Sequence, residues 1–224
     1  MMMAKLAKQV EEIAHALDLQ RMPVGARFSE KPDRIGVNRK LRICETLNLI
    51  NQENVVVNLS KENCPCKGGC HVAGWQTLPS DELAATYLNH KVYGSKEAAE
   101  ASVRKQPQPT YRGKFLILGP LDRFEADPDV VLFFVNPAQA DRILGLASYE
   151  GAKPSMHYPV TSMCSTIMHA LAKGKPDVNF ISVFERRRGT WSPNELIVTL
   201  PFKHFQIVVK SIPRSGYGSP SASE

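Results

Sequence analysis

The sequence has no long apolar run, and this absence limits the classes of protein to which it can belong. No stretch reaches the roughly 18 apolar residues that a membrane-spanning helix requires. The first residues, MMMAKLAKQVEEIAHAL, form an interrupted amphipathic pattern without a cleavage site for export. We therefore expect a cytoplasmic protein with no membrane span.

The common nucleotide and hydrolase motifs are also missing. The chain contains no G-x-G-x-x-G after a strand, no G-x4-G-K-[ST] and no G-x-S-x-G. Its net charge is +6, but the basic residues are dispersed and the densest run is Arg186-Arg187-Arg188. Because a nucleic-acid interface needs a concentrated basic surface, we do not expect nucleic acid as a partner.

What is present is an ordinary globular composition, with 43% hydrophobic and 22% charged residues in a chain of 224. This length favours a single domain, which we assign to 1–213, with a candidate subdomain boundary near 106–112 in a proline-rich connector. Residues 214–224, rich in Ser, Gly and Pro, are expected to form a flexible tail.

Hydropathy periods predict helices and strands mixed in an irregular order. That order indicates an α+β fold: a single domain with a mixed or antiparallel sheet and flanking helices. Pro23 favours an edge position for the first strand. The predicted helices cover 4–19, 38–51, 81–89, 96–105, a segment that begins at 136–137, another near 162, and 202–212; the predicted strands cover 22–28, 55–59, 114–118, 130–135, 178–184 and 195–200.

The most informative segment is a cysteine-rich loop, Asn63-Cys64-Pro65-Cys66-Lys67-Gly68-Gly69-Cys70-His71. Three cysteines within seven residues are too close for an ordinary disulfide framework, and clustered thiols in a cytoplasmic chain are more often metal ligands or redox groups. Gly68 and Gly69 let the backbone bend closely around a bound group, and exposed N–H groups can hydrogen-bond cluster sulfides. The loop therefore predicts a metal centre.

Two further cysteines can complete that centre. Cys44 and Cys164 each fall on the apolar stripe of a predicted helix, so both are expected to face the interior. A four-iron cluster usually has four cysteine ligands, and Cys44, Cys64, Cys66, Cys70 and Cys164 are the candidates, one more than required. An iron–sulfur cluster, 4Fe-4S in type, is the expected cofactor, although the spacing matches no standard ferredoxin motif.

Other interpretations stay open at this stage. Zinc is the main rival metal, although a second C-x2-C pair is absent. A c-type haem box would be one residue shorter than Cys66 to His71. A reactive cysteine with a histidine base is the main alternative without metal, either Cys164 with His157 or His169, or Cys70 with His71. Arg42 and Arg27 would then hold a small anionic substrate.

The chain resembles the uncharacterised DUF169 family of mostly archaeal and anaerobic bacterial proteins. The resemblance runs from about Val10 to Ile212, and its matching cysteines are Cys44, Cys66 and Cys164, whereas Cys64 and Cys70 look like additions. It implies that the helix cysteines and the loop cysteine share one site. The segments that carry it are Met22–Phe28, Leu41–Cys44, Cys66–Gly69, Asp129–Asp141 with its NPAQAD sequence, and Thr199–Phe202.

These observations lead us to expect an oxygen-sensitive iron–sulfur protein. It would transfer electrons to a protein redox partner or serve as an accessory of a larger anaerobic enzyme complex. Cys44, Cys64, Cys66, Cys70 and Cys164 would be the metal ligands, with Gly68, Gly69 and Arg42 next to the cofactor. An enzyme with a reactive cysteine or a zinc site, and a purely structural subunit, are the alternatives.

Overall fold

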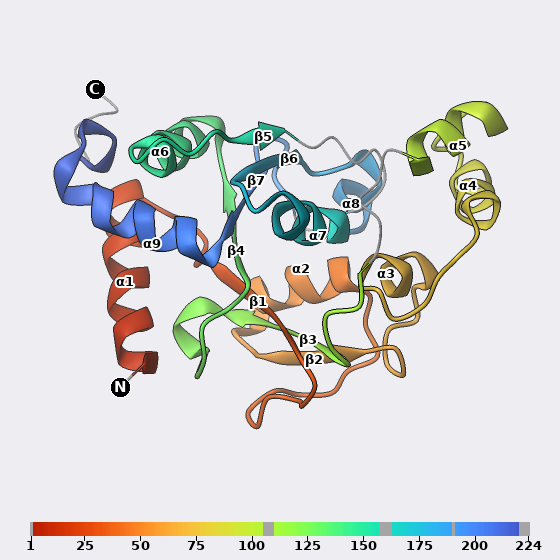
Figure 1. The fold of residues 1–224 in the computed structure, drawn as a ribbon, viewed down its shortest axis with the longest axis horizontal. Coiled ribbons are helices and arrows are strands. Elements are labelled where there is room, and N and C mark those ends of the chain that lie inside the picture. The colour runs from red at the N-terminus through yellow and green to blue at the C-terminus, as the bar shows by residue number, and fades with distance from the viewer. Residues whose placement is uncertain (1, 105–109, 157–162, 190, 220–224) are drawn as a thin grey trace.

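A single mixed sheet of seven strands forms the centre of the protein, in a computed structural model that describes residues 2–104, 110–156, 163–189 and 191–219. The strand order is β2-β3-β1-β4-β7-β6-β5. All neighbours are antiparallel except β5 and β6, which are parallel. Helices flank the sheet (Figure 1), so the expected α+β single domain is confirmed. The strands are β1 Val24–Ser29, β2 Val57–Ser60, β3 Phe115–Pro120, β4 Val130–Val135, β5 Ser155–Met156, β6 Asp177–Phe180 and β7 Leu196–Pro201.

The first strand is central, and this corrects the edge position that we expect from Pro23. β1 pairs with β3 on one side and with β4 on the other. Pro23 lies just before the strand, where its missing N–H removes no ladder bond, and its carbonyl accepts a hydrogen bond from the N–H of Leu121 at 2.9 Å.

Side-chain alternation along the strands divides the interior into two apolar cores. In β4, Val130, Leu132 and Phe134 face one core, and the intervening Val131, Phe133 and Val135 face the other. The second core is closed by α1, α6 and α9, and the first by α2, α7 and the residues after α3 (Figure 1). The helices are α1 Met2–Leu17, α2 Ile43–Glu53, α3 Lys67–Val72, α4 Ser80–Asn89, α5 Lys96–Arg104, α6 Pro137–Ser148, α7 Cys164–Lys173, α8 Val183–Arg188 and α9 Phe202–Ser211.

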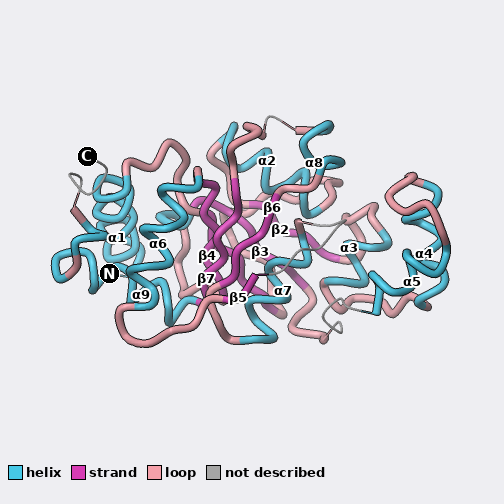
Figure 2. Tube along the Cα trace, turned by 90° about the horizontal axis from the view of Figure 1, so that it is seen from above, coloured by secondary structure: helices cyan, strands magenta, loops and turns pink. Residues whose placement is uncertain are grey.

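Helices α4 and α5 form a hairpin with a small apolar core of its own, made by Leu83, Ala84, Ala99 and Val103. The hairpin lies at the end of the molecule, beyond α3 and away from the sheet (Figure 2). It is anchored to α3 by an ion pair between Lys67 and Glu82, whose Nζ and Oε1 atoms are 3.0 Å apart. Much of the connector that follows, with part of the candidate boundary near 106–112, lies outside the described residues.

Most predicted elements are present, and the errors are local. α2 begins at Ile43 rather than after Asn38. The segment predicted as a strand over 178–184 is β6 followed by α8, and the cysteine loop contains the short helix α3. For α3 and α8, a cap at the helix start explains why a helix forms where a loop or an extended chain is expected.

Part of the expected flexible tail is packed against the body. Gly216–Gly218 forms a turn of 3₁₀-helix, and Arg142 of α6 donates hydrogen bonds to the carbonyl oxygens of Tyr217 at 2.9 Å and Ser219 at 2.7 Å. Residues 220–224 lie outside the described residues. None of the helices in the described ranges is long and apolar enough to cross a membrane.

Candidate metal centre

The first ligand candidate, Cys44, is the second residue of α2 and is half-buried on the face that packs on the sheet. The helix begins here because the Glu45 carboxylate accepts a hydrogen bond from the backbone N–H of Arg42 at 2.9 Å, satisfying a donor at the helix start. Ile43, Leu47 and Ile50 bury the helix in the core. Cys44 is thereby held at the end of α2 nearest the cysteine loop.

The turn after β2 determines where the loop cysteines lie. The side-chain oxygen of Asn63 accepts the N–H of Ser60 at 2.7 Å, and its amide donates to the carbonyl of Asn58 at 2.8 Å. The N–H of Cys64 donates to the carbonyl of Ser60 at 2.9 Å. These bonds turn the chain back after the strand, and the Cys64 side chain is buried.

Helix α3 places the other two loop cysteines. Its N-cap is Cys66, whose Sγ accepts a hydrogen bond from the N–H of Gly69 at 3.3 Å. Cys70 belongs to the helix, and its side chain is buried. A Cβ on Gly69 would be 3.5 Å from the Cys64 Sγ and 3.7 Å from the Cys66 Sγ. Gly69 therefore lies beside two thiols, and a Cβ there would be in ordinary van der Waals contact with both sulfurs.

The fifth cysteine comes from the other half of the chain. Cys164 is the first residue of α7 and is buried in the same core as α2, with Ile167 and Met168 on the same helix face. α7 packs against α3 and against β4, β6 and β7. The expectation that Cys44 and Cys164 face the interior is thus confirmed by their places in the core.

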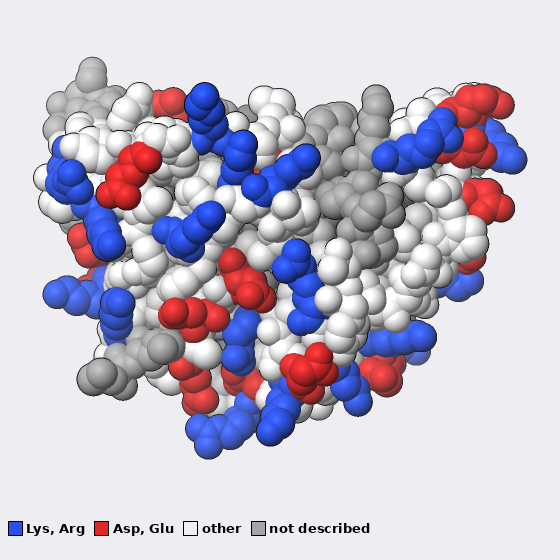
Figure 3. Space-filling view, in the orientation of Figure 1, with Lys and Arg blue, Asp and Glu red and all other residues white. Residues whose placement is uncertain are grey.

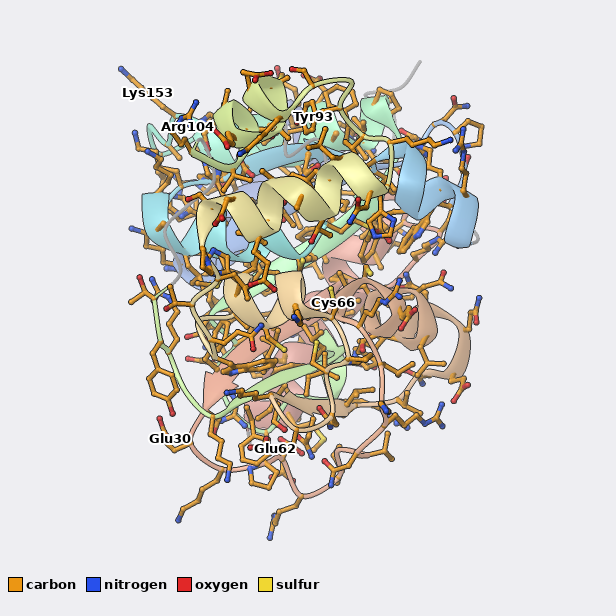
Figure 4. All side chains as sticks on the ribbon, turned by 90° about the vertical axis from the view of Figure 1, so that its right-hand side faces the viewer. Glu30, Glu62, Cys66, Tyr93, Arg104 and Lys153 are labelled. Carbon is orange, nitrogen blue, oxygen red and sulfur yellow. The ribbon has the colours of Figure 1, made fainter. Side chains whose placement is uncertain are left out.

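The five thiols form one cluster. Cys44 is close enough to interact electrostatically with both Cys66 and Cys164, and Cys70 interacts with the same two residues. Cys44, Cys66, Cys70 and Cys164 thus form a closed ring of neighbours. Cys64 stands outside the ring, hydrogen-bonded to Cys70. Figure 4, seen from the side of the hairpin, shows Cys66 at the centre of this end of the molecule, beneath α4.

The protonation of the thiols reflects their surroundings. Burial raises the pKa of the Cys44 thiol, and the nearby Glu185 carboxylate and Cys164 raise it further. The interaction between the Cys64 and Cys70 thiols raises the pKa of Cys64 and lowers the pKa of Cys70. Without a cation at the centre, the environment therefore favours neutral thiols at Cys44 and Cys64, because charged thiolates would be buried next to one another.

The arrangement does not have the geometry of a site for a single ion. Within the described ranges, no three His, Cys, Asp or Glu side chains are close enough to hold one metal ion. A zinc ion would need its sulfur ligands about 2.3 Å from one point. The ligands of a cluster bind different iron atoms, so their sulfurs can be further apart. All five donors are soft thiols, the ligand type that iron–sulfur clusters use.

A small pocket of about 70 Å³, partly open to solvent, lies beside Cys44. Cys44 lines it together with Glu45, Asn48, Glu185, Gly189 and Trp191. The Cys44 thiol is hydrogen-bonded to Glu185, which is buried at 7% exposure and is the third residue of α8. The indole of Trp191 packs on Phe134 at a centroid distance of 4.9 Å.

Glu185 and Trp191 were not expected at the site. They lie far along the chain, in a segment predicted as strand and turn, and no spacing or motif links them to Cys44. α8 forms because the Ser182 hydroxyl accepts the N–H of Glu185 at 3.4 Å, and this cap directs the carboxylate back toward α2. Only a Ser three residues before a Glu, the pattern of a capping box, could have indicated this helix.

The arginines proposed to hold an anion have other partners. The Arg42 Nε lies 3.7 Å from the Glu45 carboxylate, and an Arg27 nitrogen lies 3.5 Å from that of Asp33. Neither arginine lines the pocket, whose ionisable residues Glu45 and Glu185 are acidic. Elsewhere on the surface, basic and acidic side chains are interspersed on the face seen in Figure 3.

Two of the histidines proposed as bases, His71 and His169, have other partners. The Nδ1 atom of His71 accepts the N–H of Leu78 at 3.0 Å, and burial lowers the pKa of this histidine. The Nδ1 of His169 lies 3.2 Å from the Asp177 carboxylate, and His169 is about 140° around α7 from Cys164. His157 lies outside the described residues. His204 is buried at 7% exposure, because α9 packs on the core at this turn.

Comparison with known proteins identifies the family of the chain. Residues 12–211 match the DUF169 family, described as uncharacterised ArCR. The chain is also similar to the uncharacterized protein MJ0308 of Methanocaldococcus jannaschii, with 23% identity over 213 residues, 93% of this chain and 84% of that protein. No solved structure matches it. Because the family match covers nearly the whole domain, the chain belongs to the DUF169 family.

Proposed function

We propose that this protein binds an iron–sulfur cluster, of the 4Fe-4S type, at the cysteine cluster. The observation that carries the proposal is the convergence of five thiols from three separate segments: the start of α2, the loop with α3, and the start of α7. Packing alone rarely gathers so many thiols, whereas a thiolate-bound cluster requires it.

The ring of neighbours suggests which thiols ligate. Cys44, Cys66, Cys70 and Cys164 each have two ring neighbours, while Cys70 is the one ring thiol with which the Cys64 thiol interacts. Because the Cys64 thiol is directed to the carbonyl of Cys66 as well as to Cys70, we assign the four ring thiols as ligands and Cys64 as the spare. The N–H of Gly69 on the Cys66 sulfur is a hydrogen bond of the kind that tunes cluster potentials.

Bound there, a cluster would supply one-electron transfer. The protein would pass electrons to a redox partner or serve as an accessory of a larger enzyme complex. The centre lies beside the hairpin of α4 and α5, at the end of the molecule rather than in the middle of the sheet (Figure 4), a position from which electrons can reach a partner. Co-purification of a redox enzyme with the tagged chain would support this role.

Anaerobic purification followed by iron, sulfide and zinc analysis tests the cluster. We expect iron and sulfide in equal amounts, a brown protein, and an EPR signal after chemical reduction. Cys44→Ser and Cys164→Ser should lose most of the iron, and Cys64→Ser should retain it. Met168→Leu, a buried change one turn along α7 from Cys164, is the matched control and should keep full iron content.

Two outcomes would contradict the proposal. A colourless protein with one zinc per chain would replace the cluster by a zinc site. Iron content that is equal in wild type and in both ring variants would show that the metal is bound elsewhere.

The pocket beside Cys44 favours a second candidate, an enzyme that acts on a small molecule through this thiol. Its two carboxylates favour a substrate with hydrogen-bond donors rather than an anion. Labelling of metal-free protein with iodoacetamide would support this candidate if alkylation were confined to Cys44 and the native protein bound no metal. Alkylation of all the half-buried thiols at similar rates would argue against it.

A further inference from the structure

We propose that Cys64 and Cys70 form a reversible disulfide when the cluster is absent, making this pair an oxidation site inside the metal centre. The inference rests on the proposed function only in giving Cys70 a second role as a cluster ligand. The bond itself requires no metal. The two states exclude each other, because a sulfur bonded to Cys64 is no longer a thiolate available to iron.

The geometry of this pair differs from that of the other thiols. The thiols of Cys64 and Cys70 interact with each other, and the Cys70 thiol donates a hydrogen bond to the carbonyl oxygen of Cys64 at 3.4 Å, while the Cys64 Sγ lies 3.9 Å from the carbonyl oxygen of Cys66. Cys66, although nearer to Cys70 in sequence, directs its sulfur to the N–H of Gly69. The first turn of α3 therefore separates the sulfurs of Cys66 and Cys70 and brings those of Cys64 and Cys70 together.

Burial determines the chemical class of oxidant. Cys64 is 6% exposed and Cys70 is 4% exposed, so a protein disulfide cannot reach either sulfur for exchange. Hydrogen peroxide is small enough to enter. We therefore infer that peroxide, rather than an oxidoreductase, oxidises the pair.

The reaction balances with one peroxide. The Cys70 sulfur attacks one peroxide oxygen, the O–O bond breaks, and the released hydroxide takes the proton of Cys70 to give water and a sulfenic acid. The Cys64 sulfur then attacks the sulfenic sulfur, the S–S bond forms, and the hydroxide that leaves takes the Cys64 proton. Two thiols and one peroxide thus give one disulfide and two waters, and a small dithiol reverses the change.

Digestion with trypsin separates the two cysteines into different peptides, so mass spectrometry can detect a disulfide between them. Cleavage after Lys61 and Lys67 places Cys64 in the peptide 62–67 and Cys70 in the peptide 68–91. Full-length protein is stripped of metal with a chelator, reduced, desalted, treated with one equivalent of peroxide and alkylated before digestion. We expect the two peptides to be joined, with loss of two hydrogen masses, and to separate after reduction.

Matched serine variants identify the partner of Cys70. Cys64→Ser should abolish the cross-link, whereas Cys66→Ser, in the same peptide, should leave its yield unchanged. Wild-type protein whose five thiols all remain alkylated would overturn the proposal. A cross-link that persists in Cys64→Ser would overturn it too. Circular dichroism confirms that each variant is folded.

The same assay on cluster-loaded protein tests the link to the metal. Peroxide should give the cross-link only as iron is released, at least tenfold more slowly than in metal-free protein. A cross-link that forms at equal rates with and without bound iron would overturn the mutual exclusion. If the native protein binds no iron, the proposed function is wrong, but the assay on metal-free protein still tests whether Cys64 and Cys70 form a disulfide.

Discussion

The two faces of the sheet differ in what closes them. On one face, α1, α6 and α9 pack mainly through apolar side chains, with buried hydrogen bonds from Gln139 and Arg142 to the end of α1, and no described cysteine lies there. On the other face, α2 and α7 bury apolar residues in the same way, but their first turns and α3, with the loop that leads into it, contribute all five cysteines. One face therefore serves stability, whereas the other carries, in addition, the five thiols that we propose bind a cluster.

Removal of the proposed cluster should have the largest effect, and it should affect the two faces of the sheet differently. We expect chelation under anaerobic conditions to increase hydrogen exchange in α2, α3 and α7, because the proposed cluster would link their ends, while α6 and α9 keep their protection. Mass spectrometry of exchanged peptides measures this. An equal loss of protection on both faces would mean that the cysteine-bearing face has no special dependence on metal.

Leu→Ala substitutions that leave similar cavities on the two faces should lower stability equally but should differ in their effect on iron content. Leu47 of α2 and Leu146 of α6 are both fully buried. Leu47→Ala and Leu146→Ala should each lower the free energy of unfolding by about 2–5 kcal/mol. Only Leu47→Ala, three residues from Cys44, should lower the iron bound per folded protein. Urea titration and iron analysis check the two expectations, and iron loss in Leu146→Ala would contradict them.

Loss of one helix cap should have a smaller effect, confined to the apolar face. The Asn136 side chain accepts the N–H of Gln139 at 2.9 Å, and the Gln139 side chain accepts the N–H of Asn136 at 3.0 Å. Asn136→Ala should destabilise the protein by about 1 kcal/mol and leave iron binding unchanged. Ser182→Ala, which removes the cap of α8, should instead disturb Glu185 and the pocket beside Cys44. Thermal unfolding with metal analysis distinguishes the two variants.

These examples show which features the sequence could reveal. The start of α6 was predictable because Asn136 and Pro137 are local signals, and the inward direction of Cys44 and Cys164 followed from helical periodicity. α3 was not predictable, because two adjacent glycines have poor helix propensity and the helix depends on a cysteine sulfur as its cap. The separation of Cys64 from the ring depends on tertiary packing and has no local signal at all.

The smallest effect that we expect is a pH dependence that comes from the apolar face. Burial lowers the pKa of His204 on α9, and its Nδ1 has no hydrogen-bond partner among the described residues. In the unfolded chain this histidine titrates near 6.5. As the pH falls below that value, the unfolded state takes up a proton before the folded state does, so this group lowers stability until the folded-state pKa is passed. His204→Gln should remove that part of the decline: its stability relative to wild type should increase between pH 7 and pH 5 in urea titrations of metal-free protein. Parallel curves for the two proteins over this range would show that His204 is protonated as easily in the folded state as in the unfolded one.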